Sequence, residues 1–208
     1  MAVDGPDENL DRHGRIAWSL SATVDWLYDK LGRRLRVDTH DGAVDVTFLR
    51  LAEISAEMEG RNVDALREAI QAQSWFSEEK TYAVYYRGPT DDAGGIKQGS
   101  FATVFSDTCR TDREHYYVAT EPGFLGALEN TMAHELFHTM GVVHEECATN
   151  PAANGTSHVG DFDNDLMAVG RRRGRMITEI DIGRDDYWQP GIAGCRDAAD
   201  SPLWIPDG

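Results

Sequence analysis

Two histidines four residues apart constrain this chain more than any other feature. The segment Ala133–Glu145 reads AHELFHTMGVVHE and contains His134 and His138. On an α-helix, residues i and i+4 lie on one face, so both imidazoles can reach the same metal ion. Glu135 follows the first histidine and is placed to take a proton from water beside that ion. The sequence therefore predicts a helix with a metal site and an adjacent base.

A third imidazole follows at a spacing that suits the same ion. His144 stands six residues after His138, and Gly141 lies between them. A continued helix would place position 144 on another face, so the chain must turn, and a glycine can adopt the positive φ that such a turn needs. Zinc suits imidazole ligands. We therefore expect one zinc ion bound by His134, His138 and His144. A helix with incidental histidines is the weaker alternative.

The segment from His134 to His144 resembles the HExxHxxGxxH motif of the metzincin clan of zinc metallopeptidases. That clan also has a methionine in a tight turn beneath the metal. Met167, in the sequence Asn-Asp-Leu-Met, is our candidate for this Met-turn, with a gap-filling core residue as the alternative. The neighbourhood of Met167 further resembles a group of bacterial, mainly actinobacterial, metallopeptidases with an HV-x-D…NDLM segment.

The resemblance implies an α+β fold over residues 15–208, preceded by a flexible lead-in over residues 1–14. In the clan, a twisted mixed sheet and two helices form an upper lobe, an active-site helix backs the cleft, and the lower lobe is irregular. The edge strand of the sheet pairs with an extended peptide substrate. Counting strands back from the helix makes Phe101–Phe105 this edge strand and Tyr116–Thr120 its neighbour.

Periodicity and turn signals predict the other elements. Apolar spacing indicates a helix over Ile16–Leu31 that ends at Gly32, and Asn62 is placed to cap a second helix. A third helix is expected after Gly126, ending near Met140. The runs expected as strands are residues 35–39 and 44–51, split by a turn at Asp41-Gly42, together with Thr81–Tyr86, Phe101–Phe105 and Tyr116–Thr120. The glycine-rich stretch Thr90–Gly99 between two of these runs reads as an exposed loop.

The resemblance implies a zinc-dependent endopeptidase that hydrolyses peptide bonds, with Glu135 as general base. A peptide or protein would be the substrate, and we expect a monomer. One alternative is a non-catalytic relative that only binds a protein partner in its cleft, although a purely structural site has no use for Glu135. Another is a zinc hydrolase that acts on a non-peptide amide.

One residue departs from the clan's pattern, and two others stay open. Val169 occupies the position where some clan members carry a tyrosine that assists the transition state. Tyr187 is a nearby tyrosine, but an ordinary packing role is the preferred interpretation. His158 is open in the same way, because it could support a metal ligand or lie on the surface.

Three cysteines allow one disulfide. We favour Cys147–Cys195 over either pair with Cys109, because that bridge would pin the C-terminal tail beneath the metal site. The bridge would imply an oxidising, extracellular compartment. The first residues lack the basic and apolar regions of a signal peptide, so an intracellular location stays open.

Asp161, Asp163 and Asp165 form a dense acidic cluster just before Met167. Hard cations collect carboxylates, so a Ca²⁺ site is one interpretation. The EF-hand pattern is not met, and a solvated turn is the preferred alternative.

Charge excludes one class of partner. Thirty-six acidic residues against twenty basic ones give a net charge of −16, and such a surface repels nucleic acid. The basic run Arg171–Arg175 is a local exception, which we interpret as a solvated loop or a site of proteolytic nicking. The chain also lacks the roughly 18 consecutive apolar residues of a membrane helix, so no membrane span is expected.

Overall fold

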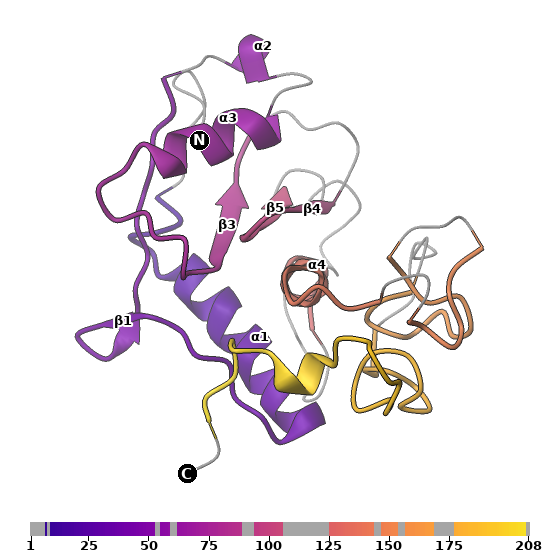
Figure 1. Cartoon of the computed structure of the whole chain (residues 1–208). Coiled ribbons are helices and arrows are strands. Elements are labelled where there is room, and N and C mark those ends of the chain that lie inside the picture. The colour runs from indigo at the N-terminus through magenta and orange to yellow at the C-terminus, as the bar shows by residue number, and fades with distance from the viewer. Residues whose placement is uncertain are drawn as a thin grey trace.

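A computed structural model describes residues 7, 9–52, 55–58, 62–88, 94–105, 125–143, 147–153, 157–168 and 177–206. Helices and a mixed sheet occur together in these residues, which confirms the predicted α+β class (Figure 1). No helix among them is both long and apolar enough to cross a bilayer. The helices are α1 (Arg15–Leu31), α2 (Ser55–Met58), α3 (Asn62–Gln71), α4 (Ala127–Thr139) and the 3-10 turn η2 (Ala198–Asp200). The strands are β1 (Thr39–His40), β2 (Ala43–Val44), β3 (Tyr82–Tyr86), β4 (Gly95–Gln98) and β5 (Phe101–Phe105).

Helix α1 ends as the sequence predicts. Gly32 has φ 68°, and its N–H donates to the carbonyl oxygen of Tyr28 at 2.8 Å. A positive φ is easy for glycine, which explains why the helix stops there. The buried face carries Val24 and Leu27, and it packs against α4. Helix α3 confirms the second predicted helix, and its Leu66 is buried.

The main sheet has the order β3-β5-β4. Strands β3 and β5 run parallel, with Tyr82 opposite Phe101, and β4 runs antiparallel to β5. Both β3 and β5 were predicted. Every residue of β5 is buried, because the strand is covered on both edges and packs against α4.

The predicted edge strand is wrong. Among the described residues, β5 is the central strand and β4 lies at the edge. The stretch Thr90–Gly99 that we interpreted as a loop therefore contributes a strand over Gly95–Gln98. Gly-Ile-Lys-Gln has low intrinsic strand preference, so pairing with β5 rather than local propensity determines this element. The expected neighbour, Tyr116–Thr120, lies outside the described residues.

The predicted hairpin forms only at its turn. Asp41 and Gly42 both have positive φ, as a type I′ turn requires, and β1 pairs with β2 over two residues on each side. Residues 45–50 belong to no strand, contrary to the prediction. A cavity of about 580 Å³ is lined both by this run and by β3. A cavity therefore separates this run from β3, and the two form no backbone ladder.

Helix α4 lies between the sheet and the irregular C-terminal third, and α1 packs against it as well (Figure 1). It starts just after Gly126 and ends just before Met140, as predicted. All residues from Leu128 to Phe137 are buried. A helix with so many consecutive buried residues belongs to the core, so its polar residues need partners or a ligand.

Apart from η2, the described residues beyond α4 are irregular, as predicted, and buried aromatic side chains anchor them. Tyr187 packs edge-on against Phe137 of α4, with ring centroids 5.7 Å apart, and Trp188 packs against Trp204. The predicted disulfide Cys147–Cys195 is present. Its sequence separation of 48 residues corresponds to about 4 kcal/mol on loop-closure reasoning. Three predicted features, namely Cys109, Val169 and the run Arg171–Arg175, lie outside the described residues.

Candidate metal centre

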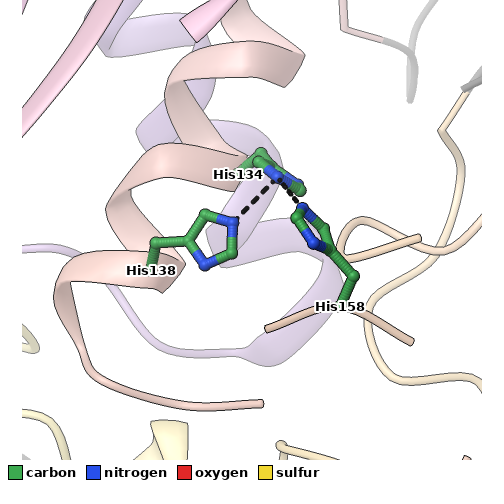
Figure 2. A group of neighbouring side chains, drawn as sticks. All are labelled: His134, His138 and His158. Carbon is green, nitrogen blue, oxygen red and sulfur yellow. Dashed lines mark hydrogen bonds between the residues drawn. The ribbon is translucent and has the colours of Figure 1, made fainter. Parts of the chain in front are cut away.

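Three imidazoles point toward one another beside α4. His134 and His138 come from successive turns of the helix, and His158 comes from the facing loop (Figure 2). The Nε2 atom of His134 lies 3.1 Å from Nε2 of His138 and 3.1 Å from Nε2 of His158. The helix spacing places the first two nitrogens, as predicted, and the loop brings the third.

These distances fit one tetrahedral metal ion. Nitrogens that each lie about 2.0–2.1 Å from zinc are separated by about 3.3–3.4 Å. The two observed separations of 3.1 Å are close to that value. All three ligand atoms lie within 4.8 Å of one another, so they form a group that could hold a metal ion. The donor set is therefore compatible with zinc.

A backbone contact fixes the tautomer of the central histidine. Nδ1 of His134 lies 2.7 Å from the carbonyl oxygen of Leu166. A carbonyl oxygen can only accept, so Nδ1 carries the hydrogen and the neutral ring keeps its lone pair on Nε2. Metal-binding histidines commonly make this contact with their second nitrogen. His134 is therefore oriented as a ligand, with its lone pair directed at the other two rings.

His158 was not among the ligands predicted from the sequence. The predicted third ligand, His144, lies outside the described residues, so that assignment stays a prediction. The structure instead brings His158 to the other two rings. The cause is the backbone beside it, because Val159 N–H donates to the carbonyl oxygen of Met167 at 2.9 Å. The only sequence signal for this was the closeness of His158 to Met167.

Met167 lies in a tight turn beneath the histidines. Ala168 N–H donates to the carbonyl oxygen of Asp165 at 3.2 Å and closes the turn. The side chain of Met167 is fully buried. The carbonyl oxygen of the preceding residue, Leu166, is the one that His134 contacts. The predicted methionine thus occupies a turn that touches the candidate site.

The backbone reverses just after α4, at the predicted glycine. Gly141 has φ 73°, and a side chain there would meet the guanidinium of Arg196 at 2.7 Å. Val143 also has a positive φ, of 58°, which is rare for a β-branched residue. Such strain persists only where surrounding contacts enforce it. Arg196 follows the disulfide cysteine Cys195, so the bridged tail packs against this reversal.

Glu135 faces an open cavity of about 600 Å³ beside the three imidazoles. Its exposed fraction is only 6%. Strand β4 forms another wall of the cavity, and its Gly95 passes so close that an added Cβ would lie 2.9 Å from Oε1 of Glu135. The cavity volume falls within the range typical of ligand sites. A carboxylate, three imidazoles and a sheet edge therefore share one accessible cavity.

The three carboxylates considered as a possible calcium site do not gather. Among the described residues, only two groups of possible ligands lie within 4.8 Å of one another, and Asp161, Asp163 and Asp165 do not form either of them. The second group is Asp181, Asp185 and Asp186. Asp165 instead faces the protein interior, where burial raises its pKa to about 6. It accepts hydrogen bonds there from backbone and tyrosine donors.

No family model, curated protein or solved structure matches this chain. Any assignment of function therefore rests on the geometry of the site and on the motif that carries it.

Proposed function

We propose that this chain is a zinc-dependent endopeptidase of the metzincin type. The observation that carries the proposal is the approach of three imidazole nitrogens beside the buried carboxylate of Glu135 in an open cavity. A closed structural site has four protein ligands, whereas three nitrogens leave a position open. Zinc, when bound, makes a water molecule more acidic and polarises the carbonyl under attack.

The residues of the chain would supply the general base and the metal ligands. Glu135 accepts a proton from the attacking water and delivers it to the amine of the departing peptide. His134, His138 and the third histidine hold the ion, and the Leu166 carbonyl orients His134. The overall reaction is a hydrolysis, in which one water molecule and one peptide bond give one carboxylate and one amine.

Strand β4 is the element best placed to bind an extended substrate. It is an edge strand among the described residues, and its Gly95, Ile96 and Lys97 line the cavity. An edge strand offers backbone donors and acceptors to an added strand, which is a common mode of peptide recognition. We place the enzyme in an oxidising, extracellular compartment, because the Cys147–Cys195 disulfide suits that environment.

Digestion of casein or a peptide library by the zinc-loaded protein tests this function. We expect cleavage that a chelator abolishes and that added zinc restores in proportion to bound metal. Zinc-loaded protein that binds peptides without cleaving them would refute the enzyme. It would favour the alternative of a protein that only binds a partner in its cleft.

Gly95→Ala tests the placement of Glu135. The new Cβ would lie 2.6 Å from Cγ2 of Thr131 and 2.9 Å from Oε1 of Glu135, so the carboxylate must move. Because misplacing a reacting group by about 1 Å can cost about 100-fold, we expect kcat/KM to fall by about 10- to 100-fold with zinc affinity unchanged.

Gly94→Ala is the matched control for that substitution. Its Cβ would meet Thr131 no closer than 3.8 Å, which is ordinary van der Waals contact. We expect near-normal cleavage by this variant. Equal kcat/KM for the two alanine variants would contradict the proposed contact between β4 and Glu135.

A further inference from the structure

We propose that Tyr187 and Asp165 are positioning residues that hold the candidate metal site together from below. The inference rests on the proposed function, since it concerns how the same site keeps its ligands in place. The hydrogen bonds of both residues go to the backbone and to one another rather than to the three imidazoles. Both act through the turn that contains Met167.

The turn over Asp165–Ala168 contacts both the helix and the loop that supply the imidazoles. Its Leu166 carbonyl contacts Nδ1 of His134 at 2.7 Å, and its Met167 carbonyl accepts the N–H of Val159 at 2.9 Å. The first contact orients a histidine of α4. The second fixes the residue directly after His158. A displacement of this turn would therefore move His134 and His158 relative to one another.

Asp165 holds the turn through its side chain. Its Oδ1 accepts the Met167 N–H at 2.7 Å and the hydroxyl of Tyr187 at 2.8 Å, and its Oδ2 accepts the N–H of Ile182 at 3.1 Å. Asp165 is 1% exposed. Three donors around a buried carboxylate compensate for the water that it loses. The carboxylate thus ties the turn to the segment that begins at Asp181.

Tyr187 provides the connection to the rest of the core. Its hydroxyl donates to Asp165 and accepts the N–H of Asp181 at 2.8 Å, so both of its roles are filled. Its ring packs edge-on against Phe137. In the sequence, Phe137 stands between His134 and His138 of α4. One side chain therefore spans from the helix that bears His134 to the turn that orients it.

The loop over residues 181–188 fixes the position of Tyr187. The carboxylate of Asp181 accepts backbone N–H groups from Asp185, Asp186, Tyr187 and Trp188. Successive N–H groups that converge on one carboxylate lock the loop in a single shape. The packing role that we preferred for Tyr187 is therefore accompanied by a specific polar contact.

Zinc affinity of Tyr187→Phe tests the inference. Phenylalanine keeps the ring packing and removes only the hydroxyl. Loss of a partner that supports a metal ligand costs about 10- to 100-fold in affinity, and we expect a Kd weaker by that factor in competition with a chromophoric chelator. The Co²⁺-substituted variant should also show an altered d–d spectrum, which a loss of stability alone would not produce.

Tyr85→Phe is the matched control. Tyr85 is half-buried, and its hydroxyl donates to Oγ of Ser19 at 3.3 Å, between β3 and α1. This variant loses a hydrogen-bonded tyrosine hydroxyl but leaves the turn beneath the site intact. We expect its zinc Kd and Co²⁺ spectrum to match those of the wild type. An equal loss of affinity in both variants would overturn the specific role of Tyr187.

Asp165→Asn is a second variant that tests the same inference. It keeps the test possible if Tyr187→Phe does not fold. Donors face both oxygens of Asp165, so an amide must direct its own N–H groups at one of them. We expect a loss of zinc affinity at least as large as that of Tyr187→Phe. Zinc affinity within twofold of the wild type in the folded variants would overturn the inference.

These outcomes stay separate from the test of peptidase activity. Zinc-loaded wild-type protein that cleaves no peptide would refute the proposed enzyme and leave the positioning role standing. An active wild type whose two variants bind zinc normally would refute the positioning role alone.

Discussion

Glu135→Gln removes peptide hydrolysis while the protein keeps its zinc. Glutamine has the same shape but cannot accept the proton of the attacking water. General-base catalysis contributes about 10²–10⁴-fold to rates, so we expect kcat/KM to fall by that factor. Because Glu135 is not among the imidazole ligands, bound zinc should stay at one ion per chain. Peptide cleavage and metal analysis on the same preparation measure both effects.

Glu129→Gln is the matched control on the same helix. Glu129 is as deeply buried as Glu135, but its Oε1 accepts the hydroxyl of Ser19 at 2.7 Å and faces α1. Burial raises the pKa of Glu129 above its ordinary value, because the charged form loses water there. Glutamine keeps the length and shape of this side chain. We expect nearly unchanged cleavage by this variant. Zinc-loaded Glu135→Gln protein with near wild-type kcat/KM would remove Glu135 from the mechanism.

His158→Ala weakens zinc binding by more than about 100-fold, which exceeds the usual effect of losing a supporting partner. The structure brings Nε2 of His158 to 3.1 Å from Nε2 of His134, so its removal leaves only two imidazoles of the described group. Peptide cleavage should be lost in parallel. Competition with a chelator measures the affinity, and His138→Ala should behave in the same way.

His144→Ala and His40→Ala are the two variants to compare with His158→Ala. His144 is the third ligand that the motif predicts, whereas His40 is an exposed residue of β1. We expect His40→Ala to bind zinc as the wild type does. If His144→Ala releases zinc and His158→Ala retains it, the third ligand is the one predicted from the sequence, and the described arrangement of His158 is wrong.

The helical part of the site could be predicted because it depends only on residues close together in the sequence. A spacing of four residues places His134 and His138 on one face of any helix, and the apolar pattern with Gly126 and Gly141 sets the bounds of α4. The stop of α1 at Gly32 was predictable for the same reason. The cysteine pair was predictable because few pairings exist among three residues.

The remaining parts depend on contacts between distant residues, which a single sequence does not reveal. Strand β4 forms because β5 lies beside it, although Gly95–Gln98 carries no strand pattern. His158 reaches the site through the pairing of Val159 with the Met167 turn. In the sequence, Asp165 resembled a surface calcium ligand, because the sequence does not show which carboxylates are buried. Its burial lets it accept hydrogen bonds from the Met167 turn and from Tyr187 instead.

An anomalous-difference map from zinc-loaded crystals, recorded at the zinc absorption edge, tests the central claim most directly. The claim is that three imidazoles from α4 and the facing loop bind one metal ion. We predict a single strong peak about 2.0–2.1 Å from Nε2 of His134, His138 and His158. A peak elsewhere in the molecule, or one with the ring of His158 turned away from it, would contradict the account.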